Sequence, residues 1–177
     1  MGQKVIGKTP KAISWLAEQE RDAEWEIKPY KQARSNRQNA YYWRLLTEVA
    51  DRMRMSKAEC HNRMLRDYGQ PAYFDGEVPF VMLPDTDEAE RDAFRSETFH
   101  IRPTANVRSG KDHDYRAYIV LRGSHELNTL EMSILLDGLI QEAKQLGIET
   151  ATPAELTAMQ EYDRKREDRK NAQRDTG

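Results

Sequence analysis

The sequence predicts an α+β fold, in which a small, mainly antiparallel sheet packs with about four to five helices. Two long segments, 36–54 and 129–146, repeat apolar residues at the spacing of amphipathic helices. Residues 118–121, Tyr-Ile-Val-Leu, form a continuous apolar run typical of a central strand. Residues 24–28 alternate between polar and apolar side chains, as a half-buried strand does, and Pro29 limits that strand to an edge or marks its end.

Local start and stop signals bound the expected helices. Ser56 with Glu59 has the spacing of a capping box, in which each side chain bonds the other residue's backbone. Asn128 with Glu131 offers similar chemistry. Gly69 is the residue type favoured where the chain turns left-handed after a helix. The expected helices are 9–20, 36–54, 56–69, 86–94, 129–146 and 153–162.

Within 36–54, one helical stripe carries the apolar side chains, and it predicts that Trp43 lies in the core. In the centre of the chain, Pro79 argues that the strand expected at 77–83 lies at an edge of the sheet. Segment 104–114 is polar and contains glycine, so we expect a mobile loop there. Segment 115–122 is the strongest strand candidate and should be central.

The length of 177 residues suits a single domain spanning 1–162, built either as one body or as two subdomains joined near 70–114. Residues 163–177 are almost wholly charged or polar and should form a solvated extension or tail. No apolar run has the length of a membrane span, and residues 1–20 lack the apolar centre of a signal peptide. We therefore expect a cytosolic protein. The single Cys60 excludes an internal disulfide and a thiolate-rich zinc site.

Charge is distributed unevenly although the net charge is only -2. Between residues 28 and 66, ten Lys and Arg outnumber three acids, whereas between 67 and 97 nine acids outnumber two Arg. The local net charges are therefore +7 and -7. The two blocks fit a polyanion-binding face with an acidic edge, and they also fit a solvated surface whose opposite charges compensate each other, so charge alone does not decide between the two.

The segment 34–44, Arg-Ser-Asn-Arg-Gln-Asn-Ala-Tyr-Tyr-Trp-Arg, combines cations, amides and aromatic rings at the start of an expected helix. Cations neutralise phosphates, amides reach phosphates or base edges, and aromatic faces stack on unpaired bases. The alternative is that Tyr42 and Trp43 are core residues and that Tyr41 covers a helix flank. The candidate nucleic-acid-binding residues are Lys28, Lys31, Arg34, Ser35, Arg37, Gln38, Asn39, Tyr41 and Arg44.

The motif Arg34-Ser35-x-x-Gln38-Asn39-x-x-x-Trp43 resembles the NinB family of phage recombination proteins, also called the lambda Orf type. A second patch agrees in order and spacing: residues 123–129 lead into Glu131-Met132-Ser133, and Gly147-Ile148 follows. The resemblance implies a homodimer that binds single-stranded DNA without catalysis and without a cofactor or metal. It also implies a mediator role, in which the protein helps a recombinase to displace single-strand-binding protein.

Two other functions remain open. A phage factor could bind a host protein through the acidic block 67–97. A metal-dependent nuclease could use His113 and Asp114 with His61, although no two histidines have the spacing of a helical metal pair. The chain has no glycine-rich phosphate loop and no nucleophile motif, so neither nucleotide hydrolysis nor nucleophilic catalysis is indicated.

Overall fold

The computed structural model describes residues 9–20, 24, 36–159, 161–162 and 165. The chain divides into two compact units, Met1–Gln32 and Ala33–Gly177. The first unit contains helix α1 (Thr9–Ala17), which confirms the helix predicted at 9–20. The strand predicted at 24–28 lies outside the described residues, apart from Glu24. The expected cap Ser35 also lies outside them.

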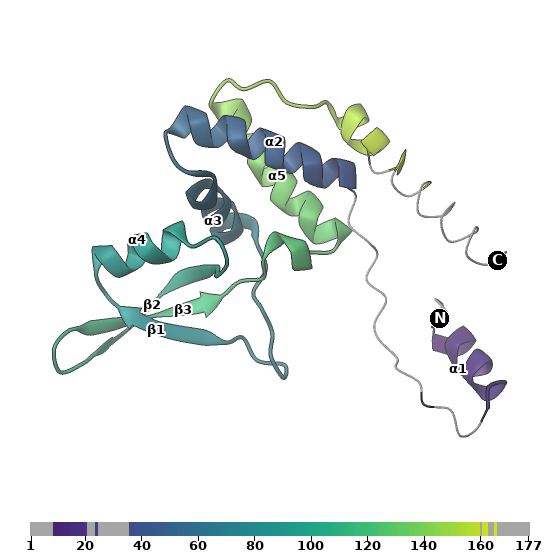
Figure 1. The fold of residues 1–177 in the computed structure, drawn as a ribbon, viewed down its shortest axis with the longest axis horizontal. Helices are drawn as coiled ribbons and strands as arrows, with labels where there is room; N and C mark the ends of the chain where they lie inside the picture. The colour runs from purple at the N-terminus through teal and green to yellow at the C-terminus, as the bar shows by residue number, and fades with distance from the viewer. Residues whose placement is uncertain (1–8, 21–23, 25–35, 160, 163–164, 166–177) are drawn as a thin grey trace. The chain divides into compact units, whose positions relative to one another are not determined.

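The second unit confirms the α+β prediction. Its helices are α2 (Asn36–Met53), α3 (Lys57–Tyr68), α4 (Asp87–Arg95) and α5 (Thr129–Gln145), with a 3₁₀ turn η1 (Ser124–Glu126) and a short helix at 153–159. Strands β1 (Phe80–Pro84), β2 (Ile101–Ser109) and β3 (Asp114–Val120) form an antiparallel sheet in the order β1-β3-β2. Figure 1 shows α2 beside α5, with α3 between this pair and the sheet. None of the described helices is long and apolar enough to cross a membrane.

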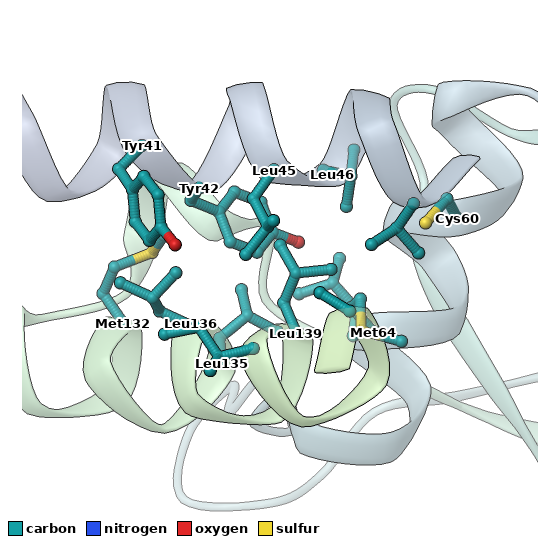
Figure 2. Packing of buried hydrophobic residues seen from close by; sticks show 14 of the residues in the cluster. Tyr41, Tyr42, Leu45, Leu46, Cys60, Met64, Met132, Leu135, Leu136 and Leu139 are labelled. Atoms are coloured by element: carbon teal, nitrogen blue, oxygen red, sulfur yellow. The ribbon is translucent and has the colours of Figure 1, made fainter. Parts of the chain in front are cut away.

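The core lies between α2, α3 and α5. Leu45 and Leu46 of α2 are fully buried, and Figure 2 shows them pointing toward the leucines of α5. Cys60 of α3 belongs to the same cluster, and burial raises the pKa of its thiol to about 11. The thiol therefore stays protonated at neutral pH and acts as a small apolar side chain.

The capping boxes form as predicted. Ser56 Oγ accepts from the backbone N–H of Glu59, and Asn128 Oδ1 accepts from that of Glu131. The left-handed turn predicted at Gly69 is wrong, because its φ of -77° is ordinary extended backbone. Glycine is needed there for space, since a Cβ atom would lie 2.4 Å from the Leu65 carbonyl oxygen.

The sheet confirms two strand predictions and overturns a loop. β1 lies at an edge of the sheet, as Pro79 predicted for the strand expected at 77–83. β3 is the central strand, as the apolar run predicted. The mobile loop predicted at 104–114 is wrong, because most of this segment belongs to β2. A register shift separates Pro103 from Val107, and side chains hydrogen-bond to the backbone there. Thr104 Oγ1 donates to the Ala117 carbonyl at 2.8 Å, and Arg116 Nη1 donates to the Thr104 carbonyl at 2.9 Å. An edge strand with one exposed face can carry polar residues, so polarity alone misled the prediction.

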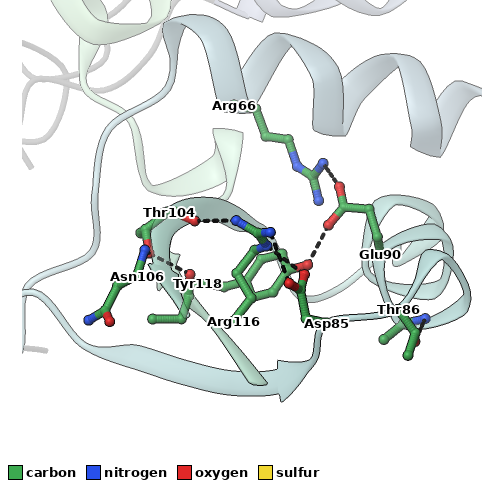
Figure 3. Close-up of polar contacts among 10 residues, drawn as sticks. Arg66, Asp85, Thr86, Glu90, Thr104, Asn106, Arg116 and Tyr118 are labelled. Atoms are coloured by element: carbon green, nitrogen blue, oxygen red, sulfur yellow. Dashed lines mark hydrogen bonds and ion pairs between the residues drawn. The ribbon is translucent and has the colours of Figure 1, made fainter. Parts of the chain in front are cut away.

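The two oppositely charged blocks partly compensate each other (Figure 3). Arg66 of the basic block pairs with Glu90 of the acidic block and also donates to the Ile101 carbonyl. The same Glu90 carboxylate accepts from the Tyr118 hydroxyl at 2.6 Å. Burial and this hydrogen bond raise the pKa of Tyr118 to about 12. Arg66 and Glu90 therefore connect α3, α4 and the sheet. Charges that are paired in this way within the fold are less available to bind an external partner.

Candidate nucleic-acid interface

The residues predicted to bind nucleic acid separate into three groups. Lys28, Lys31, Arg34 and Ser35 lie outside the described residues. Gln38 and Tyr41 are buried, and Asn39 is partly buried. Arg37 and Arg44 are exposed on α2.

Gln38 and Tyr41, which the sequence predicted to contact nucleic acid, are instead engaged in packing within the fold. Gln38 Nε2 donates to the Ser133 hydroxyl of α5 at 3.0 Å. Tyr41 is only 5% exposed, and its hydroxyl accepts from the Ala151 N–H at 2.7 Å. Both side chains therefore fasten the start of α2 to α5 and to the chain that follows α5.

Arg37 and Arg44 lie seven residues apart and so share one face of α2. The Arg37 guanidinium lies 3.5 Å above the ring of Tyr162. Arg44 lies 3.7 Å from the Glu48 carboxylate, in a cleft of about 650 Å³ that Glu149 also lines. Because Glu155 adds a third carboxylate to this cleft, its electrostatic potential does not favour a polyanion. We call this face the arginine flank.

Trp43 lies on another face of the helix, and the prediction that it belongs to the core is wrong. Its side chain is 37% exposed, whereas the neighbouring Tyr42 is completely buried. The indole rests on α3, with its ring centroid 4.7 Å from that of His61. Helix α2 packs through Tyr42 and the leucines that follow it, so Trp43 falls at the edge of the buried stripe. We call this edge, together with the start of α3, the tryptophan flank.

A buried polar network lies beneath Trp43. The Tyr42 hydroxyl is 2.8 Å from His61 Nδ1, and burial raises the pKa of Tyr42 well above its usual range, so the phenol stays protonated. The rings of His61 and His100 meet at nearly right angles, with their centroids 5.3 Å apart. His100 Nδ1 is 2.6 Å from Asn62 Oδ1.

The orientation of Asn62 fixes the tautomer of His100. Asn62 Nδ2 donates to the carbonyl oxygens of Phe94 and Ser96, at 2.8 and 2.7 Å. Its Oδ1 must therefore accept from His100 Nδ1, which leaves the lone pair of this imidazole on Nε2. Burial, and next the charge of His125, lower the pKa of His100. The ring is neutral at pH 7, with one donor and one acceptor nitrogen.

His61 and His100 of this network line a pocket of about 280 Å³ that opens on the tryptophan flank. It draws its walls from α2, from the first turns of α3 and from the chain between α4 and β2. The lining residues are Trp43, Lys57, Ala58, His61, Ser96, Glu97 and His100. Sequence reasoning missed this site because its members are far apart in the chain. The sequence singles out His61 only as a residue that a metal-dependent nuclease could use, which does not indicate a pocket with Trp43 and His100.

The residues of the nuclease alternative lie in different surroundings. His61 borders this pocket, whereas His113 stacks on Tyr115 at the β2–β3 turn, with ring centroids 4.6 Å apart. Among the described residues, no group of three or more His, Cys, Asp or Glu could hold a metal ion.

Comparisons with protein-family models, with curated proteins and with solved structures found no match to this chain. The resemblance to the NinB family therefore rests on the sequence motifs alone.

Proposed function

We propose that this chain is a phage-type recombination accessory protein that binds single-stranded DNA without sequence specificity and without catalysing a reaction. The observation that carries the proposal is Trp43, a tryptophan of an amphipathic helix that is exposed rather than buried and that lines a pocket with Lys57. An exposed indole stacks on any unpaired base, and a lysine beside it neutralises a phosphate.

The structure changes which residues we assign to this function. Trp43 and Lys57 replace Gln38 and Tyr41 at the centre of the interface, since the latter two are occupied in packing. Arg37 and Arg44 are exposed but lie on the flank that carries the acidic cleft, so they contribute less. The cations at 28–34 lead directly into α2 in sequence and remain candidates for phosphate contacts.

The remaining parts of the proposal come from the resemblance to the NinB family. It implies a homodimer that needs no cofactor and acts in the bacterial host cytoplasm. It also implies that the protein cooperates with single-strand-binding protein or with a recombinase. Size-exclusion chromatography with light scattering checks the dimer, and a mass near the monomer value of 20.7 kDa would contradict it.

The test is fluorescence anisotropy of a labelled single-stranded oligonucleotide of mixed sequence, measured across a salt series. We expect the logarithm of the affinity to fall linearly with the logarithm of salt, with a slope of about -0.7 for each phosphate contacted. Trp43→Ala should weaken binding by roughly 5- to 150-fold, the usual effect of losing one base-stacking contact. Phe80→Ala is the matched control, because it removes an exposed aromatic ring that does not line the pocket. Absence of binding at low salt would refute the proposal.

A second candidate is a protein-binding phage factor that uses the acidic block 67–97. The observation in its favour is a tight turn at Asp75-Gly76, where Tyr73 and Phe74 are 68% and 73% exposed beside Glu77. Exposed aromatic rings between carboxylates suit a partner with an apolar and basic surface. Affinity purification with Phe74→Ser as the comparison tests this function. It would replace the first proposal if a host protein were lost with Phe74→Ser and the wild type had no affinity for DNA.

A further inference from the structure

We propose that the pocket beside Trp43 receives one unstacked base of the DNA strand and favours a base with an exocyclic amino group. This inference rests on the proposed function, since it names the part of single-stranded DNA that the tryptophan flank recognises. It also goes beyond that function. The proposed function is binding without sequence specificity, whereas this pocket would bind certain bases more tightly than others.

The size and walls of the pocket suit a single heterocycle. Its volume of about 280 Å³ lies just below the range for small-molecule pockets, which begins near 300 Å³, so it has room for no more than a small ring system. Trp43 and His61 supply aromatic surface on neighbouring walls, with ring centroids 4.7 Å apart. A base that leaves the strand loses its stacking on neighbouring bases, and an aromatic wall replaces that contact.

Two residues that line the pocket, Glu97 and His100, carry hydrogen-bond acceptors, whereas Lys57 and the indole N–H of Trp43 are donors. Glu97 has a carboxylate, and the acceptor of the His100 ring is Nε2, because Nδ1 is bonded to Asn62. Within the described part of the chain, no residue donates a hydrogen bond to Nε2 of His100. The amino groups of cytosine and adenine are donors that match these acceptors, whereas thymine presents a carbonyl oxygen at the same position.

The two histidine rings of the pocket are held in place before any ligand arrives. Two backbone carbonyls fix Asn62, Asn62 fixes the His100 ring, and Tyr42 holds His61 from the core side. Binding a base therefore orders few additional side chains, which favours affinity. Lys57 is exposed at the first position of α3 and lines the same pocket, where its ammonium group can meet the phosphate next to the inserted base.

The experiment uses the full chain with Trp15→Phe and Trp25→Phe, so that Trp43 is the sole tryptophan. Its fluorescence is recorded during titration with oligo-dC, oligo-dA and oligo-dT of equal length, while anisotropy of labelled strands reports total binding. Stacking should quench Trp43, and oligo-dC and oligo-dA should bind about fivefold more tightly than oligo-dT, the usual effect of one net hydrogen bond. Glu97→Gln, on an exposed residue, should reduce this preference without preventing folding.

The outcomes separate the inference from the function beneath it. Binding by anisotropy with unchanged Trp43 fluorescence would overturn the pocket and leave single-stranded DNA binding intact. Quenching with equal affinity for all three strands would overturn the preference for an amino group. No binding to any strand would overturn both the inference and the proposed function. Phe80→Ala should leave both the anisotropy and the Trp43 quenching unchanged. A loss of binding in that variant as large as in Trp43→Ala would count against the pocket.

Discussion

The arginine flank and the tryptophan flank both include residues of α2, but they differ in how many carboxylates lie beside their cations. On the arginine flank, Arg44 faces Glu48, and the adjoining cleft adds two more carboxylates. On the tryptophan flank, an exposed indole, Lys57 and a neutral imidazole border a small pocket, to which Glu97 adds a single carboxylate. The number of arginines in a segment is therefore a poor guide to where a polyanion binds. The charges already paired within the fold must be subtracted first.

Tyr41 should give the largest effect, and that effect should be on stability. Its ring is buried between α2, α5 and the segment at Ala151, so Tyr41→Ala should lower the free energy of unfolding by about 3–5 kcal/mol. Tyr41→Phe, which loses only the hydroxyl, should cost about 1 kcal/mol. Urea unfolding measures both changes. If Tyr41→Ala left stability unchanged but weakened DNA binding, Tyr41 would belong to the interface after all.

Charge reversal compares the two flanks directly. Lys57→Glu should weaken binding of single-stranded DNA roughly tenfold at low salt, because it removes a phosphate contact and adds repulsion. Arg44→Glu should change affinity by less than about twofold, since Arg44 already lies among carboxylates. Both side chains are exposed, so circular dichroism should show unaltered helix content in each variant. Equal losses in the two variants would make the arginine flank an equal partner in binding.

A smaller effect concerns pH and the network beneath Trp43. Burial lowers the pKa of His100 in the folded state, so protons bind the unfolded chain more readily than the folded one. The unfolded pKa of histidine is about 6.5. Above that pH the contribution of His100 to the free energy of unfolding is fully present, and it is lost as pH falls toward the lower pKa of the folded state. The urea midpoint should therefore drop between pH 7.5 and pH 5. His100→Gln should reduce this drop, and an identical pH dependence in that variant would contradict the assignment.

The sequence predicted the fold better than the site, for a physical reason. Capping boxes and the apolar run of β3 are local signals, and the structure confirms them. Helical spacing predicted that α2 is amphipathic, but it could not assign the edges of the buried stripe. Tyr41 and Trp43 are about 200° apart on the helix, and each could have been the buried one.

Partners distant in sequence decided between them. The backbone N–H of Ala151, 110 residues after Tyr41, donates a hydrogen bond to the Tyr41 hydroxyl and so holds that side chain in the core. His100 lies 38 residues from Asn62, and no periodicity connects it to His61. The strand β2 was missed for a related reason, since the side chains of Thr104 and Arg116 compensate for its irregular register only once the strands have paired. Contacts of this kind are set by tertiary structure and leave no short-range pattern.

The most direct test of the central claim, that single-stranded DNA binds at the tryptophan flank, is photo-crosslinking. An oligonucleotide containing 5-iododeoxycytidine would be irradiated with the protein, and the linked peptides would be identified by mass spectrometry. We expect crosslinks at Trp43 and in the peptide that contains Lys57 and His61, because these residues line the pocket. Crosslinks confined to residues 149–159, beside Arg44, or to Tyr73 and Phe74 would contradict it.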